Sequence, residues 1–273
     1  MEKSKLRKPA VAGQFYPLSN ESLKEQIEIL VDKELKKIDI IACMLPHAGY
    51  LYSGKVAAQT ASQIKIRDTV ILLGPNHTGY GVPFSIMTEG VWQTPMGEVA
   101  IDSALAKQIL SHSSYLKEDS LAHLHEHSLE VELPFLQYFK TDFKIVPIIL
   151  STDQASILKE IGKEIAQTIN ASGIKDSIML VASSDLTHYE SQAQAQKKDK
   201  QAIQAILDLN EDTLMEKIQQ LNISMCGYAP VITVIVAAKL LGAHSSRLIK
   251  YQTSGDITQD FESVVGYAGI IIY

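Results

Sequence analysis

The sequence predicts an α/β fold, a three-layer α/β/α sandwich with a mixed central sheet. Apolar strand-like runs alternate along the chain with amphipathic stretches of roughly 10–17 residues, which is the order of elements in α/β proteins. Short strand-like runs within 82–101 and a closing pair of strands indicate a mixed rather than purely parallel sheet. The chain has 273 residues, 46% of them hydrophobic, so one sizeable core is expected, and we predict a single domain over residues 1–273.

The predicted strands are the apolar runs, and the predicted helices are the segments with apolar side chains at helical spacing. Strands are expected at 39–45, 69–74, 144–150, 178–183, 247–252 and 263–272, with shorter ones within 82–101. Helices are expected at 19–35, 54–65, 102–111, 192–207, 211–220 and 228–241, with two more that begin near residue 128 and after 151–153.

Polar residues suited to helix capping mark where several helices begin. Ser19 and Asp102 precede two of them, because a short side chain there can accept a hydrogen bond from a free backbone N–H group. The helix beginning near Ser128 contains Pro134, which fits only in the first turns or at a kink. The clearest helix follows 151–153, because isoleucines recur every four residues at Ile157, Ile161, Ile165 and Ile169.

The charge balance argues against two classes of partner. The chain carries 25 basic and 31 acidic residues, a net charge of -6, so neither nucleic acid nor an anionic membrane is an expected partner. The basic residues at the start of the chain are interpreted as a solvated end; they are Lys3, Lys5, Arg7 and Lys8.

Cysteine usage and hydropathy predict a cytoplasmic protein. Cys43 and Cys226 are the two cysteines, too few for a disulfide framework, and the N-terminus does not resemble a signal peptide. The longest apolar segment, 229–243, contains Lys239 and is too short to span a bilayer. A reducing compartment follows from these features.

Three predicted strands end in a histidine that lies in a turn rich in glycine or polar residues. These histidines are His47, His77 and His188. Ligands of an open α/β sheet bind beyond the carboxyl ends of its strands. Three imidazoles brought to that edge indicate a metal site or an acid–base site, although each taken alone is also compatible with an ordinary turn residue.

Three further residues are candidates for the same site. Asp185 lies three residues before His188, where it can ligate a metal, orient the ring or cap a helix. Cys226 precedes the last predicted helix, and a helix N-terminus lowers the pKa of a thiol; a structural buried cysteine is the alternative. His127 opens the helix near residue 128 and is the functional candidate of its segment, whereas His123 and His125 are expected to be solvated. No role is expected for His112 and His244.

The motifs around these residues resemble those of the Memo family over nearly the whole chain. The matching segments are 7–17, 46–50, 74–77, 126–128, 183–189, 226–228, 254–256 and 265–269. The family's fold is similar to that of class III extradiol ring-cleaving dioxygenases, which hold non-haem Fe(II) with two histidines and one carboxylate. The resemblance therefore implies a mononuclear metal site on this fold.

The resemblance also implies a role for each candidate residue. His47 and His77 match the two histidine ligands, and Cys226 stands in place of the carboxylate as the third ligand. His188 matches the acid–base histidine and is a candidate fourth ligand, and Asp185 and His127 complete the expected catalytic set beside the metal. Fe(II) is the first expectation, with copper or zinc as alternatives, because a thiolate is softer than a carboxylate.

The expected function is therefore that of a Memo-family metal-binding protein with a mononuclear non-haem iron or copper site. If it is an enzyme, it is an oxidoreductase acting on a small molecule that the sequence does not identify. Bacterial relatives imply a second form of this role, as the metal-holding partner of an AMMECR1-like protein and a radical-SAM protein. Two alternatives stay open: an adaptor for phosphorylated or acidic peptide segments, and a hydrolase that depends on Cys226.

Overall fold

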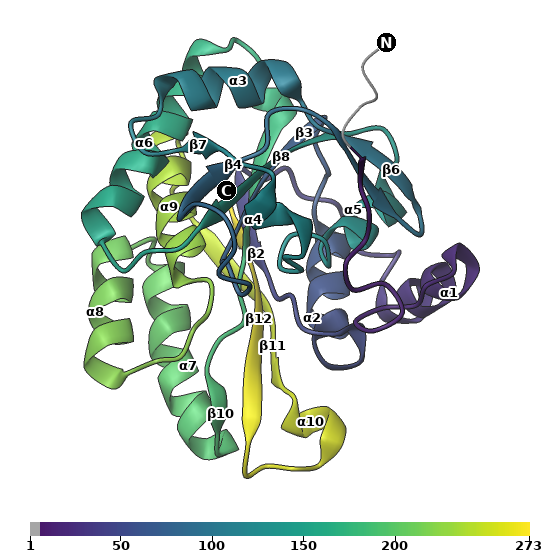
Figure 1. Ribbon diagram of the computed structural model, residues 1–273. Coiled ribbons are helices and arrows are strands. Elements are labelled where there is room, and N and C mark those ends of the chain that lie inside the picture. Colours follow the sequence, from purple (N-terminus) through teal and green to yellow (C-terminus); the bar gives the residue numbers. More distant parts are fainter. Residues whose placement is uncertain (1–5) are drawn as a thin grey trace.

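The protein is an α/β sandwich in which a large mixed sheet lies between two layers of helices (Figure 1). The computed structural model describes residues 6–273. Within these residues, nine strands form the main sheet, and three short strands form a second sheet beside it. The predicted fold class is therefore confirmed.

Four parallel strands form the centre of the main sheet. Their order in space is β2, β9, β3, β8, so β9 lies between two strands that are consecutive in the chain. The four strands are buried almost throughout, which explains their uninterrupted runs of aliphatic residues. Their bounds are Ala42–Leu45 (β2), Thr69–Gly74 (β3), Lys144–Leu150 (β8) and Ile178–Ser183 (β9).

Antiparallel pairs flank this centre and make the sheet mixed, as predicted. The last strand, β12, pairs with β11 along one edge and with β2 and β10 on the other, and β4 pairs antiparallel with β8. The bounds are Phe84–Ile86 (β4), Lys117–Glu118 (β7), His188–Glu190 (β10), Ser246–Thr253 (β11) and Val264–Ile272 (β12). The second sheet contains Leu6–Arg7 (β1), Val91–Thr94 (β5) and Gly97–Ala100 (β6).

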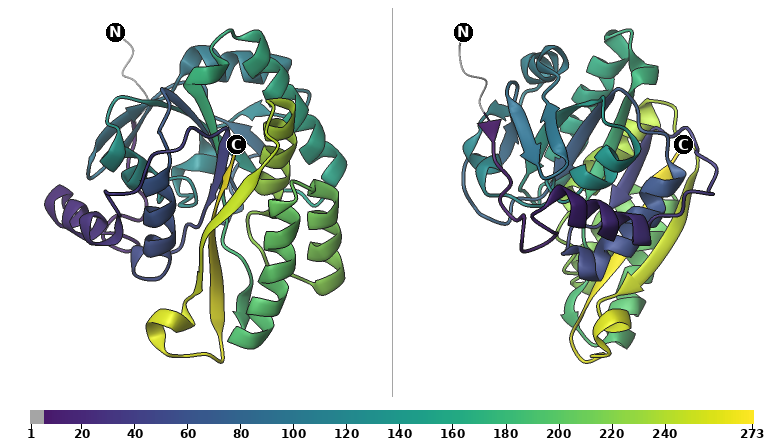
Figure 2. Two further views of the ribbon diagram at one scale, coloured as in Figure 1. Left: turned by 180° about the vertical axis from the view of Figure 1, so that it is seen from behind. Right: turned by 90° about the vertical axis from the view of Figure 1, so that its right-hand side faces the viewer.

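Helices cover both faces of the main sheet, and Figure 2 shows the two layers from two further sides. One layer contains Asn20–Leu30 (α1), Tyr50–Gln63 (α2) and Leu133–Phe139 (α5). The other contains Ala155–Ala171 (α6), Gln192–Leu207 (α7), Glu211–Leu221 (α8) and Tyr228–Leu240 (α9). The remaining elements are Ser103–His112 (α3), Leu121–Leu124 (α4), Gly255–Thr258 (α10) and the 3₁₀ turn Lys175–Ser177 (η1).

Most predicted elements are present, and three helix boundaries differ. The first helix ends at Leu30 rather than near residue 35, and α2 begins four residues earlier than predicted, at Tyr50. The helix expected from Ser128 begins only at Leu133, after a series of turns. Pro134 therefore lies in the first turn of α5, where a missing N–H costs no helical hydrogen bond.

One expectation about the chain start is wrong, because Arg7 is buried rather than solvated. Its guanidinium stacks on the ring of Trp92 at 4.3 Å and forms an ion pair with the fully buried Glu130. Glu130 also accepts hydrogen bonds from the backbone of Ala10 and from the Tyr16 hydroxyl. The guanidinium of Arg7 thus has its ion-pair and aromatic partners inside the protein.

The other basic residues at the chain start do not share this environment. Lys8 is exposed, as predicted, and Lys3 and Lys5 lie outside the described residues. Within residues 6–273, none of the helices has both the length and the apolar character needed to cross a membrane.

The contact between α2 and β12 provides a test of the packing. A Cβ atom at Gly269 would lie 1.9 Å from Thr60 Oγ1 and 3.1 Å from Thr60 Cβ, so Gly269→Ala forces the helix and strand apart. We expect it to lower the free energy of unfolding by about 1–3 kcal/mol in urea denaturation. Thr60→Ala is the matched control, and the double variant should lose less stability than the sum of the single variants. Strict additivity of the two changes would contradict this contact.

Candidate metal centre

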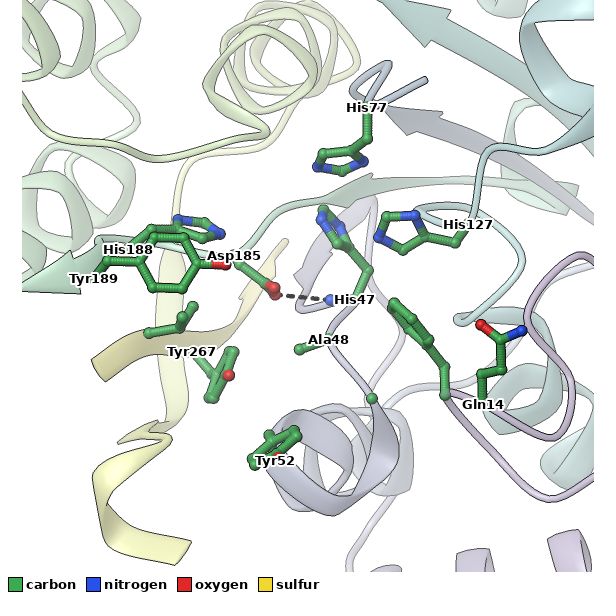
Figure 3. Close-up of a pocket in the computed structure, with 13 residues that line it drawn as sticks. Gln14, His47, Ala48, Tyr52, His77, His127, Asp185, His188, Tyr189 and Tyr267 are labelled. Carbon is green, nitrogen blue, oxygen red and sulfur yellow. Dashed lines mark hydrogen bonds between the residues drawn. The ribbon is translucent and has the colours of Figure 1, made fainter. Parts of the chain in front are cut away.

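The site lies at the edge of the sheet where three parallel strands end. His47 follows β2, His77 follows β3, and Asp185 follows β9. Because β9 lies between β2 and β3, the three strand ends are neighbours in space and deliver their side chains to one crevice. Figure 3 shows the imidazoles of His47, His77 and His127 gathered on one side of this crevice.

Three of the predicted ligands come together. The ligand atoms of His47, His77 and Cys226 all lie within 4.8 Å of one another. Bond lengths of about 2.3 Å to sulfur and about 2.1 Å to nitrogen place two ligand atoms of one ion about 3.1–3.6 Å apart. The observed separation between Cys226 Sγ and His47 Nε2 is 3.3 Å, which fits that range. The residues present are therefore compatible with one metal ion.

His47 is held in the orientation that a metal ligand needs. Its Nδ1 lies 2.8 Å from the hydroxyl of Ser183, at the end of β9, which leaves Nε2 facing Cys226. Burial, and then the neighbouring histidines, hold the pKa of His47 well below its usual range. A neutral imidazole is the form that binds a metal.

His77 is oriented by a carboxylate that the sequence analysis did not single out. The fully buried Glu126 lies 2.9 Å from His77 Nδ1 and accepts the backbone N–H of His77 at 2.5 Å. Burial alone would raise the pKa of Glu126, but the hydrogen bond and charge of His77, the charge of His127 and the Ser128 N–H outweigh it and lower the pKa to about 2. A carboxylate behind a ligating histidine is a common support in metal sites.

Cys226 stands immediately before α9, as predicted, but its thiol is not acidified. Burial raises the pKa of the thiol, and the charge of Asp185 raises it further, so the metal-free cysteine is protonated. The expectation of a lowered pKa is wrong, because burial and the charge of Asp185 raise the pKa more than the nearby hydrogen bonds lower it. Gly227 allows this approach, since a Cβ atom there would lie 2.2 Å from the Ser183 carbonyl oxygen.

His127 lies beside the proposed ligands. Its ring stacks on that of His77 at 4.6 Å and contacts the ring of Phe15 at 4.8 Å. Together with His77 and Glu126 it forms a second group of closely spaced potential ligand atoms, although the Glu126 carboxylate there already accepts hydrogen bonds from His77 and Ser128. The sequence motif 126–128 therefore contributes two residues to the site rather than one.

His188 and Asp185 lie across the crevice from this group (Figure 3). His188 Nδ1 donates to the carbonyl oxygens of Leu186 at 2.7 Å and Ser224 at 2.9 Å, so those backbone groups orient the ring. Asp185 accepts the backbone N–H of His47 at 2.9 Å. Burial raises the pKa of Asp185 to about 6, against the backbone hydrogen bond from His47. Among the described residues, the compact ligand groups include neither His188 nor Asp185.

The crevice opens into a cavity of about 490 Å³. His127, His188 and Asp185 line it together with the two proposed histidine ligands, and Phe15, Tyr52 and Tyr267 form much of its wall. A second cavity of about 380 Å³ adjoins it and shares Tyr52, Tyr189, Val265 and Tyr267 with it. The combined space is of the size that binds small molecules.

The remaining histidines divide as follows. His125 is exposed, as expected, and His112 and His244, for which no role is expected, are exposed too. His123 is not solvated, contrary to expectation: it is fully buried, and its Nε2 lies 2.9 Å from the Ser85 hydroxyl. Burial lowers its pKa to about 3, so it is a neutral core residue.

Comparison with known proteins identifies the family. The family profile described as "Memo-like protein" matches residues 7–271. The chain belongs to the Memo family. A MEMO1 family protein of Methanococcoides burtonii is 44% identical over 98% of this chain and 100% of its own length. Those of Aquifex aeolicus and Methanocaldococcus jannaschii are 43% and 42% identical, each over 98% of this chain and 99% of their own length. The resemblance read from the motifs is thus confirmed.

A solved structure supports the fold of this Memo-family chain. An uncharacterized protein from Escherichia coli K12 matches with a TM-score of 0.56, covering 85% of this chain and 99% of that chain. The sequence identity is 14%, so the likeness shows the fold alone. It agrees with the mixed α/β sandwich described above.

The charge of Glu126 provides a test in the metal-free protein. Its pKa is lowered from the usual 4.5 to about 2, so the ionised form contributes stability above pH 4.5 that is lost as the pH falls toward 2. We expect the difference in free energy of unfolding between wild type and Glu126→Gln to shrink by about 2 kcal/mol between pH 7 and pH 3. Glu25→Gln, on the exposed face of α1, should differ from wild type by less than about 0.5 kcal/mol. A difference for Glu126→Gln that is constant with pH would show that Glu126 is not held ionised.

Proposed function

We propose that this Memo-family protein holds one mononuclear metal ion through His47, His77 and Cys226 and carries out redox chemistry on a small molecule there. The observation that carries this proposal is the convergence of three ligand atoms, from three separate segments, within 4.8 Å. Ser183 and Glu126 support it, because they orient the two imidazoles so that their other ring nitrogens are free to ligate.

Iron(II) is the proposed metal, and copper and zinc are the alternatives. Two imidazoles and one thiolate form a mixed donor set that suits each of these ions. An iron ion held there would supply open coordination positions and one-electron chemistry to a bound small molecule. The thiolate itself would form only with the metal, since the metal-free thiol is protonated.

His188 is proposed as the acid–base group. Its Nδ1–H is committed to two backbone carbonyl oxygens, so Nε2 is the atom that can take or return a proton of a ligand in the cavity. Asp185, with a pKa of about 6, is mostly ionised at neutral pH and fixes the backbone of His47. His127 and Phe15 close the opposite side of the cavity.

The lining of the cavity favours a small molecule over an anionic peptide. Within the described part of the chain, no lysine or arginine lines either cavity, and Asp185 and Asp260 contribute negative charge. Recognition of phosphate or carboxylate groups in proteins relies on such basic side chains. The adaptor hypothesis is therefore the weaker candidate.

A cysteine hydrolase has one observation in its favour, the 3.3 Å contact between Cys226 Sγ and His47 Nε2. The raised pKa of the thiol argues against it, because the thiolate is the nucleophile. A role as the metal-holding partner of an AMMECR1-like protein and a radical-SAM protein is compatible with the same metal site. Both the redox enzyme and the metal-holding partner require the protein to bind a metal, so metal binding is tested first.

Metal content is the direct test. Protein purified without a histidine tag under anaerobic conditions should contain close to one iron ion per chain by ICP-MS, or bind one Fe(II) when it is added. His47→Ala, His77→Ala and Cys226→Ser should each lower metal affinity by more than the roughly 10–100-fold that loss of a ligand's hydrogen-bond partner costs. Each removes one of the three donor atoms.

Matched controls separate ligation from loss of the fold. His125→Ala removes an exposed histidine two positions before His127 in the chain, and Cys43→Ala removes the other cysteine, which is buried in the core. Both should keep the wild-type metal content. Stoichiometric copper or zinc in place of iron would change the identity of the assigned metal. A wild-type protein that binds none of Fe(II), Cu(I) and Zn(II) would contradict the proposed metal site.

Alkylation of Cys226 distinguishes a metal ligand from a hydrolytic nucleophile. In the Cys43→Ala background Cys226 is the single thiol, and we expect iodoacetamide to modify it more slowly at neutral pH than in the unfolded chain, because its pKa is raised. Pre-loading with Fe(II) should slow the reaction further, as measured by mass spectrometry. Rapid modification that is indifferent to metal would instead favour the hydrolase.

A further inference from the structure

A buried carboxyl group lies behind His47 and does not line the cavity. Glu132 is fully buried, and its Oε1 lies 2.9 Å from the Ser183 hydroxyl, the same hydroxyl that contacts His47 Nδ1. Its other oxygen, Oε2, has no hydrogen-bond partner within residues 6–273. Nothing in the proposed metal chemistry uses this group, so its presence needs a physical reason.

The hydrogen atoms around Ser183 can be assigned by counting. Ser183 Oγ has three close polar neighbours: the Ser128 carbonyl oxygen at 2.6 Å, His47 Nδ1 at 2.8 Å and Glu132 Oε1 at 2.9 Å. A hydroxyl has one proton to donate and two lone pairs to accept with. The carbonyl oxygen only accepts, so it takes the hydroxyl proton, and both lone pairs are left for the other two neighbours.

Each of those neighbours must therefore bring its own proton. His47 carries its proton on Nδ1, which leaves a lone pair on Nε2 toward Cys226 Sγ. Glu132 carries a proton on Oε1 and is neutral. An ionised Glu132 would compete with the Ser128 carbonyl oxygen for one proton, and would be a buried charge without an ion pair among the described residues.

The surroundings of Glu132 agree with this assignment. Burial raises its pKa well above the usual range and outweighs the lowering effect of the Ser183 hydroxyl, and the charge of Asp185 raises the pKa further. The nearby Cys43 is also protonated, because burial raises its pKa. Arg7, the one buried arginine among residues 6–273, is paired with Glu130 instead and does not neutralise Glu132.

We propose that Glu132 is a positioning residue that stays protonated at neutral pH and, through Ser183, holds His47 in the tautomer whose Nε2 faces the metal site. The importance of this tautomer rests on the proposed function, in which His47 is a ligand. The proton on Glu132 and the tautomer of His47 are nevertheless properties of the metal-free protein, and they can be measured there.

The experiment compares Glu132→Gln, Glu132→Leu and Ser183→Ala with wild type in the metal-free state. Infrared spectroscopy should show the C=O band of a protonated carboxyl group in wild type at neutral pH, absent in Glu132→Gln and unchanged in Glu164→Gln. Glu164 is the matched control, because it is also buried but accepts its hydrogen bonds from Ser113 and Ser114. ¹⁵N NMR should show His47 protonated on Nδ1 in wild type.

The variants should separate according to whether they can donate to Ser183. Glu132→Gln supplies an amide N–H in the same place, so the His47 tautomer should be kept and the Fe(II) affinity should stay within about threefold of wild type. Glu132→Leu removes the group that donates to the Ser183 hydroxyl, and Ser183→Ala removes the hydroxyl itself. Both should give mixed tautomers of His47 and about 10–100-fold weaker Fe(II) binding. If Glu132→Leu does not fold, the His47 tautomer in Ser183→Ala and the infrared spectrum of Glu132→Gln still test the proposal.

Failure of this inference is distinct from failure of the metal site. An infrared band that is identical in wild type and Glu132→Gln, or a single unchanged His47 tautomer in Ser183→Ala, would overturn it even if the protein binds iron. Conversely, a wild type that shows the band and the tautomer change but binds no metal would uphold the role of Glu132 and reject the proposed function.

Discussion

The parallel pairing of β9 with both β2 and β3 is the constraint on which the rest of the site depends. Residues 180–183 of β9 pair with 42–45 of β2, and residues 178–182 pair with 69–73 of β3. This register ends the three strands along one line, so that Ser183 lies between the turns that carry His47 and His77. A slip of one residue would turn the Ser183 side chain to the opposite face of the sheet and leave His47 without its partner.

Two glutamates six residues apart show how the same segment sets opposite charge states. Glu126 receives N–H groups from His77 and Ser128 and is ionised, whereas Glu132 faces a single hydroxyl and is protonated. The difference comes from the donors around each carboxyl group, since both are fully buried. Segment 126–132 thus places the negative charge of Glu126 next to His77 and the neutral carboxyl group of Glu132 behind His47.

The strand ends could be located from the sequence because they depend on local signals. Aliphatic runs followed by proline, glycine and histidine correctly place His47 and His77 after β2 and β3. The supporting residues could not be found in this way. Ser183 acquires its role only because β9 inserts between β2 and β3, which are both far from it in the chain. The spacing of Leu129 and Leu133 predicts a helix, whereas the structure has turns there that aim Glu126.

Charged and reactive residues were harder to interpret for the same reason. Arg7 reads as part of a solvated basic end, yet the buried carboxylate that pairs with it, Glu130, is more than a hundred positions away in the chain. Cys226 reads as an acidified thiol at a helix start, but its pKa is decided by the desolvation that the finished fold imposes. The sequence pattern around such residues predicts where they lie in the chain, but their charge state depends on the groups that tertiary packing places around them.

The placement of β12 has a consequence for how the protein is made. This last strand pairs with β2 through Ile270–Ile272, and Cys226 lies beside His47 at the ends of the central strands. A chain emerging from the ribosome therefore exposes His47 and His77 long before Cys226 and β12 have been synthesised. The proposed donor set is complete only after Cys226 has been synthesised, so a metal held by all three residues would be bound after that point and not by the earlier nascent chain.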